Sequence, residues 1–127
     1  MQAINKYVLF CQDAQRLHDI SFFGYKNLLY RLELKTLPSN IENMRGQCGY
    51  FYEYHLEREE DLIDIIHNKC QTITYFGIDK FKLRDFILRH RLRGVDRIVP
   101  IGSALDINVI WDGYDIIRSL SRIIDVV

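Results

Sequence analysis

Strand-like and helix-like segments alternate through the second half of the chain, and this alternation constrains the fold more than any other feature. Residues 49–54, 71–76 and 97–101 are rich in aromatic or β-branched residues, which favour strands. Helix-like segments separate them at residues 57–68 and 79–91. Strands that alternate with helices are typical of βαβ units, in which helices cover a mostly parallel sheet through right-handed crossovers. We therefore predict an α/β fold.

The second helix-like segment carries signals at both of its ends. A turn at Gly77 precedes Asp79, which is a suitable N-cap. The last turn, residues 89–91, is basic, and Gly94 follows it. Cations complement the negative end of the helix dipole, and glycine relieves the left-handed cap. The helix should therefore end before Gly94, with a buried strand after it.

The residue pattern over the first 37 positions predicts helix, with a break near Gly24. Leucines recur at helix-like spacing in the second half of this region: Leu28, Leu29, Leu32, Leu34 and Leu37. Pro38 should end this helix. Its apolar stripe is wide for a solvated helix, so we expect it to pack on a part of the protein outside this chain. The predicted organisation is a helical segment over residues 1–44 followed by an α/β lobe over residues 45–127.

An apolar run, a turn and a short helix are predicted near the C-terminus. The apolar run that ends at Trp111 meets a turn at Asp112 and Gly113. A helix should then run through Leu120, and either Asp112 or Asp115 can cap it. A β-branched run ends the chain.

Two of these segments resemble a known family. The runs QTITYFGI (71–78) and VDRIVPIGSALDINVIWDGYD (95–115) resemble the C-terminal end of the acyl-CoA reductases, in particular the long-chain fatty acyl reductases of luminous bacteria. The resemblance covers residues 45–127 well and residues 1–44 more loosely. It is specific, because IVPIG followed by WDGYD is not a general α/β pattern.

The resemblance implies an aldehyde-dehydrogenase-like fold and a C-terminal portion of a longer enzyme. Such an enzyme reduces a long-chain acyl thioester to a fatty aldehyde with NADPH, and in luminous bacteria the aldehyde serves bioluminescence. The family's nucleotide-binding region and acyl-accepting cysteine lie upstream of the matched part. We therefore expect no catalytic residue here, NADPH held mainly by parts outside this chain, and no activity from the chain alone. The implied partners are the N-terminal region of the same enzyme and acyl-protein synthetase and acyl transferase subunits.

Elementary physics also favours a fragment that needs a neighbour. A parallel sheet of three or four strands has two unpaired edges, and parallel sheets are almost always buried on both faces. The alternative hypothesis, from a different class, is a stand-alone α/β module that binds a partner protein through the exposed edge and the rim around Trp111, without catalysis.

Composition excludes several classes of protein. Seventeen basic and seventeen acidic residues give no net charge, so nothing in the balance attracts nucleic acid or an anionic membrane. Three cysteines without CxxC spacing suggest neither a disulfide framework nor a zinc site and fit a reducing cytoplasm. The longest apolar run near the N-terminus, residues 7–10, is too short for a secretory signal or a membrane span.

Cys48 is the one candidate nucleophile that the residues themselves suggest. It lies among small residues before a strand, and Arg45 could stabilise its thiolate. No histidine base is near in sequence, since the nearest is His55, and free cysteine is commonly buried. A structural role is the favoured interpretation. Cys11 and Cys70 are weaker candidates, and a thiol-dependent enzyme using Cys48 is a third hypothesis.

The remaining polar patterns have ordinary structural explanations. None of the four histidines pairs with another at metal spacing, so no metal site is predicted: His18, His55, His67 and His90. The acidic run over residues 57–64 suits a solvated first helical turn. The glycines near residues 102 and 113 form no phosphate-binding loop.

Trp111 and Tyr114 flank the predicted turn, which would put two amphipathic rings at the rim of a sheet. Such rings often close a pocket or anchor an interface. The structural alternative, which we favour, is a plug over the sheet's edge. By resemblance, residues of this rim could touch the acyl channel of a complete reductase.

Overall fold

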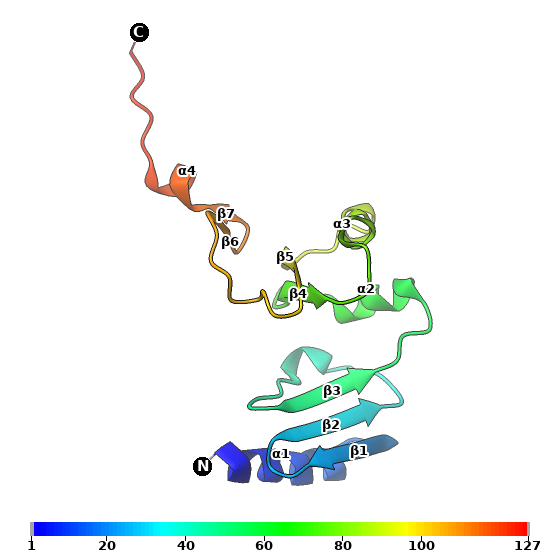
Figure 1. Ribbon diagram of the computed structural model, residues 1–127. Coiled ribbons are helices and arrows are strands. Elements are labelled where there is room, and N and C mark those ends of the chain that lie inside the picture. The colour runs from blue at the N-terminus through cyan, green and yellow to red at the C-terminus, as the bar shows by residue number, and fades with distance from the viewer. Residues whose placement is uncertain (1, 127) are drawn as a thin grey trace. The chain divides into compact units, whose positions relative to one another are not determined.

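The computed structural model describes residues 2–126 of the chain (Figure 1). Contacts divide the chain into two compact units, one that ends at Ile65 and one that begins at Ile66. Each unit combines helices with a small mixed or parallel sheet, so the predicted α/β class is confirmed at this level.

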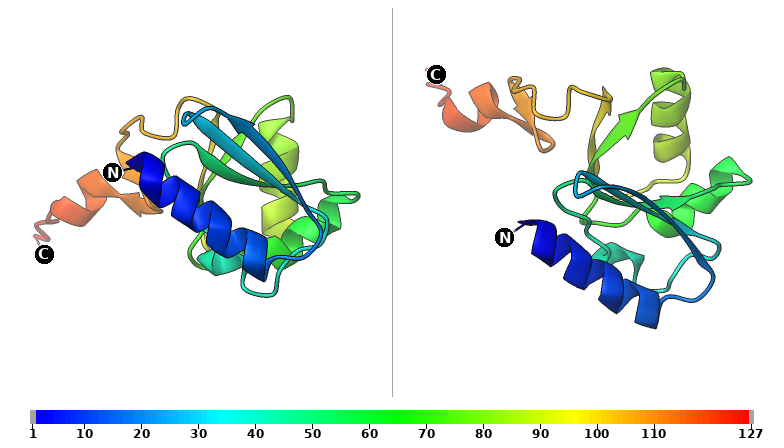
Figure 2. Two further views of the ribbon diagram at one scale, coloured as in Figure 1. Left: turned by 90° about the horizontal axis from the view of Figure 1, so that it is seen from below. Right: turned by 60° about the horizontal axis from the view of Figure 1, so that its bottom comes forward.

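The first unit is a three-stranded sheet with one long helix across one of its faces (Figures 1 and 2). The helix is α1 (Gln2–Arg16), and the strands are β1 (Ile20–Tyr25), β2 (Leu29–Leu34) and β3 (Tyr50–Tyr54). The strand order is β1-β2-β3, with β1 antiparallel and β3 parallel to the central strand β2. Three short helical elements complete the unit: η1 (Ile41–Asn43), η2 (Glu59–Asp61) and α2 (Leu62–Ile65).

The strand β2 supplies the centre of this core through period-two alternation. Tyr30, Leu32 and Leu34 are buried, whereas Arg31 between them is exposed. Leu32 is completely buried, and Tyr50 of the neighbouring strand packs in the same cluster. Leu9 and Phe10 of α1 pack against that cluster. The apolar side of β2 is thus covered by the chain's own helix.

The prediction of helix over the first 37 residues is confirmed in α1 and wrong for residues 20–34, which form the hairpin of β1 and β2. The leucines of this region fit a helical period, but Tyr30, Leu32 and Leu34 fit a period of two equally well. The pairing of β2 with β1 and β3 selects the period of two. The expectation that this apolar stripe packs outside the chain is wrong for Leu32 and Leu34, which are buried within the unit, while Leu28 is 69% exposed. Because β3 joins this sheet, the first unit extends beyond the predicted boundary near residue 44.

A buried carboxylate fastens α1 to β3. Asp13 is fully buried and accepts hydrogen bonds from the Tyr50 hydroxyl at 2.7 Å and the Tyr52 hydroxyl at 2.5 Å. Arg16 donates to its other oxygen at 3.0 Å. Burial, and then the hydrogen bonds to Asp13, raise the pKa of both tyrosines well above the ordinary value. The network satisfies a charge that would otherwise be costly to bury.

The second unit begins with one βαβ motif. Its elements are β4 (Gln71–Tyr75), α3 (Lys80–Arg89) and β5 (Val95–Pro100), and the two strands pair in parallel. Leu83, Phe86 and Ile87 form the buried side of α3. A loop then leads to the small hairpin of β6 (Ile110–Trp111) and β7 (Tyr114–Asp115), which runs directly into α4 (Ile116–Leu120).

The predicted N-cap of α3 is confirmed, whereas the predicted glycine cap at its C-terminal end is not. The Asp79 carboxylate accepts a hydrogen bond from the Phe81 amide at 2.8 Å and caps α3. The helix ends at Arg89, and the left-handed φ directly after its C-cap, His90, belongs to Arg91 (51°). Gly94 also has a left-handed φ, of 89°, but it lies three residues further along the chain. Gly94 has a second reason to be glycine, because a Cβ there would lie 2.4 Å from the His67 carbonyl oxygen.

One expectation about the sheet is wrong. The predicted strands 49–54, 71–76 and 97–101 exist as β3, β4 and β5, but they do not form one parallel sheet. The strand β3 pairs with β2, while β4 and β5 form a separate pair. The predicted helix over residues 57–68 is shorter than expected and ends at Ile65.

Candidate functional site

The residues of the run 95–115 come together at the hairpin of β6 and β7. Asp112 and Gly113 form its turn with left-handed φ values of 47° and 79°, as a type I′ turn requires. Trp111 and Tyr114 are therefore direct cross-strand partners. Asp115 caps α4 through a hydrogen bond from the Arg118 amide at 3.0 Å, which resolves the two capping alternatives.

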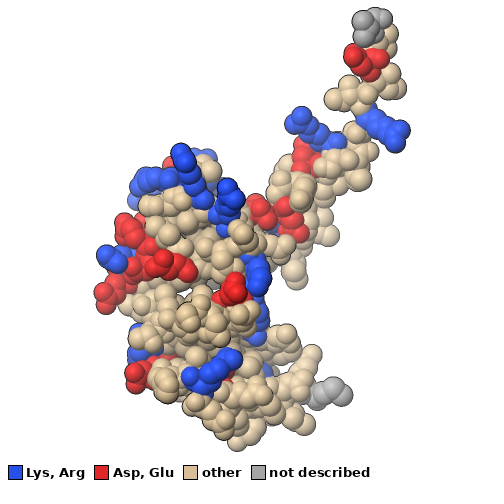
Figure 3. Space-filling view, turned by 180° about the vertical axis from the view of Figure 1, so that it is seen from behind, with Lys and Arg blue, Asp and Glu red and all other residues tan. Residues whose placement is uncertain are grey.

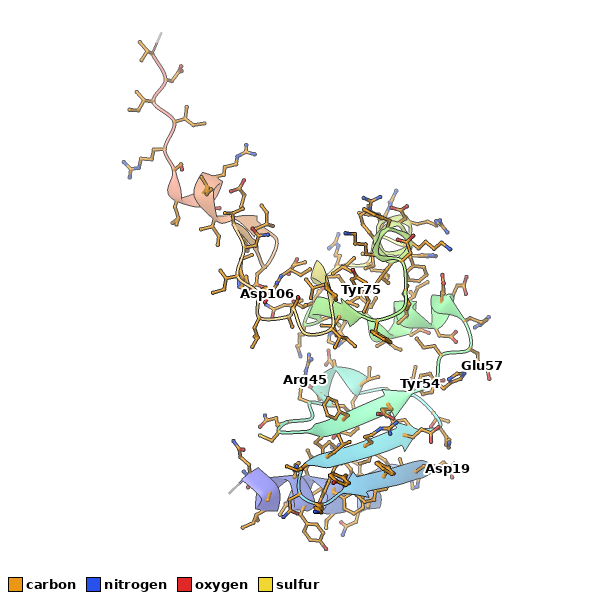
Figure 4. The ribbon with its side chains drawn as sticks, viewed as in Figure 1. Asp19, Arg45, Tyr54, Glu57, Tyr75 and Asp106 are labelled. Atoms are coloured by element: carbon orange, nitrogen blue, oxygen red, sulfur yellow. The ribbon has the colours of Figure 1, made fainter. Side chains whose placement is uncertain are left out.

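Arg97 of β5 connects this hairpin to the sheet. Its guanidinium donates to the carbonyl oxygens of Ala104 and Asp106, both at 2.9 Å. The same guanidinium lies 4.3 Å from the centre of the Trp111 ring, within cation–π range. Asp106 lies in the loop that joins β5 to β6 (Figure 4). One side chain thus fixes the course of the loop and the position of the tryptophan.

The hairpin turn also approaches β5 closely. A Cβ at Gly113 would lie 3.0 Å from a carboxylate oxygen of Asp96, so glycine suits this position both for its φ and for the available space. Arg97 and Asp96 are adjacent residues of β5. Arg97 contacts Trp111 of β6, and Asp96 lies beside Gly113 in the turn of the hairpin. We call Arg97, Asp106, Trp111 and Gly113 the arginine–tryptophan cluster.

The surface around the arginine–tryptophan cluster is apolar and exposed. Trp111 is half-buried, whereas Tyr114 is 70% exposed. The loop before the hairpin exposes Leu105 and Ile107 at 87% and 85%. A shallow pocket of about 300 Å³ runs beside β5 and is lined by Val99, Ser103 and Ile107, among others. Such a surface is suited to binding a polypeptide or an apolar ligand, because it offers apolar area rather than reactive groups.

Exposed apolar side chains continue to the end of the described chain. They lie on α4 and on the extended residues 121–126 that follow it (Figure 1). These side chains are Ile117, Leu120, Ile123, Ile124 and Val126, exposed by 62% to 94%. Monomeric proteins rarely leave so much apolar area open without a partner for it.

The structure places Cys48 in the first unit, whereas the arginine–tryptophan cluster belongs to the second unit. Its side chain is exposed, and its φ of 54° puts it in the left-handed region, at a turn closed by the Tyr50 amide and the Gln47 carbonyl. His55 lies beyond the opposite end of β3. Cys11 and Cys70 are half-buried, and the Cys70 sulfur accepts from the His67 amide at 3.4 Å.

The histidines and the acidic run have structural surroundings. The His90 ring lies 4.6 Å from the Phe86 ring, and His67 accepts from the Lys69 amide at 3.2 Å. The acidic side chains of η2 lie at the surface, and Figure 3 shows acidic residues gathered there and basic residues over α3. Among residues 2–126, no group of three or more His, Cys, Asp or Glu side chains could hold a metal ion.

NADPH does not fit the βαβ motif. A dinucleotide phosphate binds at the N-terminus of the helix after the first strand, where free amide groups and a glycine-rich turn receive it. In this chain the Asp79 carboxylate already accepts from the first turn of α3. A second negative group there would be repelled, so β4 and α3 supply no site for the cofactor's phosphates.

Sequence reasoning missed two groups of polar residues. Asp13 and Lys6 are buried charged residues of α1, and neither position was distinguished in the sequence from the exposed charges around it. The exposed pair of Arg31 and Glu53 was also missed, although it is bidentate at 2.5 and 2.7 Å. The hydrogen bond from Arg31 lowers the pKa of Glu53, and the bond to Glu53 raises the pKa of Arg31.

No helix among residues 2–126 is both long and apolar enough to cross a membrane. No protein family model, curated protein or solved structure matches the chain.

Proposed function

We propose that this chain is the C-terminal portion of an acyl-CoA reductase, an enzyme that reduces a long-chain acyl thioester to a fatty aldehyde with NADPH. The sequence resemblance is the starting point, and it is concentrated in residues 71–78 and 95–115. In this proposal the chain supplies scaffold and contact surface. Catalytic residues, the acyl-accepting cysteine and the NADPH site belong to the remainder of the enzyme.

The observation that carries the proposal is the contact between Arg97 and Trp111. Arg97 belongs to VDRIVPIG and Trp111 to WDGYD, the two parts of the run on which the resemblance rests. The same guanidinium binds the carbonyl groups of Ala104 and Asp106 between them. Residues from the two parts of the run therefore interact with one another, which supports treating the run as one structural feature.

The exposed apolar surface around the cluster supports a role as part of a larger assembly. Leu105, Ile107 and Leu120 are each more than four-fifths exposed. Burying an apolar side chain of this size stabilises an assembly by about 1.5–3 kcal/mol. In the proposed enzyme, this surface packs on the catalytic region and helps to enclose the acyl channel. Because the Asp79 carboxylate occupies the first turn of α3, the proposal places the NADPH site elsewhere in the enzyme.

Fragment complementation tests the proposal. A long-chain acyl-CoA reductase of a luminous bacterium would be truncated before the part that corresponds to residues 45–127, and the purified chain would be added to it. We expect the chain to bind the truncated enzyme and restore NADPH-dependent aldehyde formation. Trp111→Ala and Arg97→Met should lose both effects. The matched control is Arg93→Met, which removes an exposed arginine outside the cluster and should behave like the wild type.

A different result would favour the stand-alone interaction module. If the chain remains a stable monomer, ignores the truncated reductase and gives no aldehyde, the reductase proposal is wrong. Activity of the chain alone with acyl-CoA and NADPH would also contradict it, because the proposal places the catalytic groups elsewhere.

A further inference from the structure

A small pocket lies in the first unit between the start of α1 and the segment that precedes β3. Its volume is about 290 Å³, which is at the lower end of the range for small-molecule sites. Gln2, Asn5 and Lys6 line it from one face of α1, since residues three and four apart are neighbours on a helix. Gln47 and Cys48 line it from the other side. None of these residues belongs to the proposed reductase surface.

Lys6 is the unusual member of the pocket wall. It is only 5% exposed, and its ammonium donates to the carbonyl oxygens of Asn27 and Leu28, the latter at 3.1 Å. It also lies 5.2 Å from the centre of the Tyr30 ring. Within residues 2–126 these are its contacts, and none of the three groups carries a full negative charge. Burying a charge without an opposite charge is costly, so an anion in the pocket would lower that cost.

The two turns around the Lys6 ammonium pack tightly against one another. The Gly49 carbonyl accepts from the Tyr30 amide at 2.8 Å, which ties the pocket's second wall to β2. A Cβ at Gly49 would lie 2.2 Å from the Leu28 carbonyl oxygen, the same oxygen that binds Lys6. The turn before β2 and the turn before β3 are therefore held against one another around the ammonium. A site with so little freedom loses little entropy when a ligand binds.

The other pocket walls also favour negative charge. The first turn of α1 contains no acidic residue, and its first amide groups have no partner within the helix. Asn5 and Gln47 carry side-chain amides that can donate hydrogen bonds. Arg45 lines the pocket as well, and Figure 4 places it in the segment that leads to β3.

We propose that this pocket binds the anionic group, a carboxylate or a phosphate, of a small molecule. The ammonium of Lys6 holds the anion, and the amides of Asn5 and Gln47 orient it. Leu9, the apolar residue of the lining, faces the remainder of the ligand. The Cys48 thiol stands at the same wall and is covered when the pocket is occupied.

Protection of Cys48 from alkylation tests the proposal on the wild-type chain. Iodoacetamide would be the reagent, with inorganic phosphate and butanoate as separate probes and chloride at equal ionic strength as the reference. We expect at least one probe to slow Cys48 alkylation about tenfold when its concentration reaches ten times its dissociation constant. The neutral analogue butanamide should have no effect, and the alkylation rates of Cys11 and Cys70 should not change. Protection by phosphate alone or by butanoate alone would identify the anion.

Substitution of Lys6 provides the second measurement. Lys6→Gln removes the charge and should abolish protection, whereas Lys6→Arg should retain part of it. The matched control is Lys26→Gln, an exposed lysine in the turn after β1, which should leave protection unchanged. If Lys6→Gln fails to fold, the wild-type titration decides alone. The proposal is wrong if neither phosphate nor butanoate slows Cys48 alkylation at concentrations below the one at which chloride itself changes the alkylation rate. It is also wrong if Lys26→Gln removes protection as completely as Lys6→Gln.

Discussion

The two units of this chain treat charge and apolar surface in opposite ways. The first unit buries two charged side chains, Lys6 and Asp13, beside its apolar core. Among residues 66–126, by contrast, the buried side chains are Leu83, Phe86 and Ile87, all apolar. The second unit instead exposes apolar residues along its last third, such as Leu105 and Ile124.

This difference indicates which parts of the chain bury their own apolar side chains and which parts leave them exposed. In the first unit, tyrosine hydroxyls donate to the Asp13 carboxylate and a backbone carbonyl accepts from Lys6, so these polar groups specify one arrangement of α1 on the sheet. In the second unit, the βαβ motif has its own small core, but the residues after β5 leave apolar area uncovered. We infer that the first unit is built around an internal polar network and the second around contacts that another polypeptide would complete.

The largest expected effect comes from the apolar centre of the first unit. Leu32→Ala should lower the free energy of unfolding of that unit by about 2–5 kcal/mol, because Leu32 is completely buried in the cluster with Tyr30 and Tyr50. Leu105 is 87% exposed in the second unit, so Leu105→Ala should change the free energy of unfolding of the second unit by less than about 0.5 kcal/mol. Amide hydrogen exchange at increasing urea concentration would measure the free energy of unfolding of each unit separately. Equal destabilisation by the two substitutions would remove the contrast between the units.

The next largest effect should come from the buried carboxylate. Asp13→Asn should destabilise the first unit by about 1.5–3 kcal/mol, because it weakens hydrogen bonds to a charged group and gives Tyr50 and Tyr52 a poorer acceptor. Asp19→Asn is the control, since Asp19 is exposed and its left-handed φ of 54° also suits asparagine. Urea midpoints measured at neutral pH would compare the two. A stability for Asp13→Asn equal to that of Asp19→Asn would show that the network is dispensable.

How far the sequence predicted these units follows from the range of the interactions. The motif of β4, α3 and β5 was predictable because its signals are local, including the Asp79 cap and the turn at Gly77. The turn at Asp112 and Gly113 was predictable for the same reason. Each of these features depends on residues within a few positions of one another.

The hairpin of β1 and β2 was missed because its leucines fit two periods at once. Only the pairing of β2 with strands on both sides selects the period of two, and pairing is not a local property. The buried charges were missed for a related reason. Asp13 meets Tyr50 across 37 positions and Lys6 meets Leu28 across 22, so no short pattern distinguishes these residues from solvated charges.

Alkaline pH should destabilise the first unit selectively. The folded state raises the pKa of Tyr50 and Tyr52, chiefly through burial, so it favours the protonated hydroxyl. Unfolding releases tyrosines that ionise near the ordinary value of 10.0. The contribution of these tyrosines is therefore complete below that pH and declines as the pH rises above it. Urea midpoints between about pH 8 and about pH 11 would show the decline.

Tyr52→Phe should make the alkaline decline shallower, because one ionising group is removed. Tyr114→Phe is the control, since Tyr114 is 70% exposed and belongs to the second unit. A decline of the same steepness in wild type and Tyr52→Phe would mean that other groups control alkaline stability.

A smaller effect is expected in the second unit at Arg97. Arg97→Met removes two hydrogen bonds to carbonyl oxygens and the stacking on Trp111, so the hairpin should lose about 1–2 kcal/mol of local stability. Trp111 is the only tryptophan of the chain, which makes its fluorescence a specific readout. We expect emission at longer wavelength and stronger quenching by acrylamide, with Arg93→Met unchanged. Unaltered fluorescence in Arg97→Met would show that the hairpin holds its position without the arginine.

The smallest effect should come from the exposed pair of Arg31 and Glu53. Both side chains are more than one third exposed, so solvent screens their attraction, and Glu53→Gln should leave the Tm at neutral pH within about 2 °C of the wild type. The bond from Arg31 lowers the pKa of Glu53 below its ordinary value of 4.5. Its contribution is therefore complete above that value and is lost as the pH falls through the lowered pKa. Melting curves from neutral to acid pH should show the Tm difference between wild type and Glu53→Gln shrinking toward zero, and a difference that grows on acidification would contradict this account of the surface of the first unit.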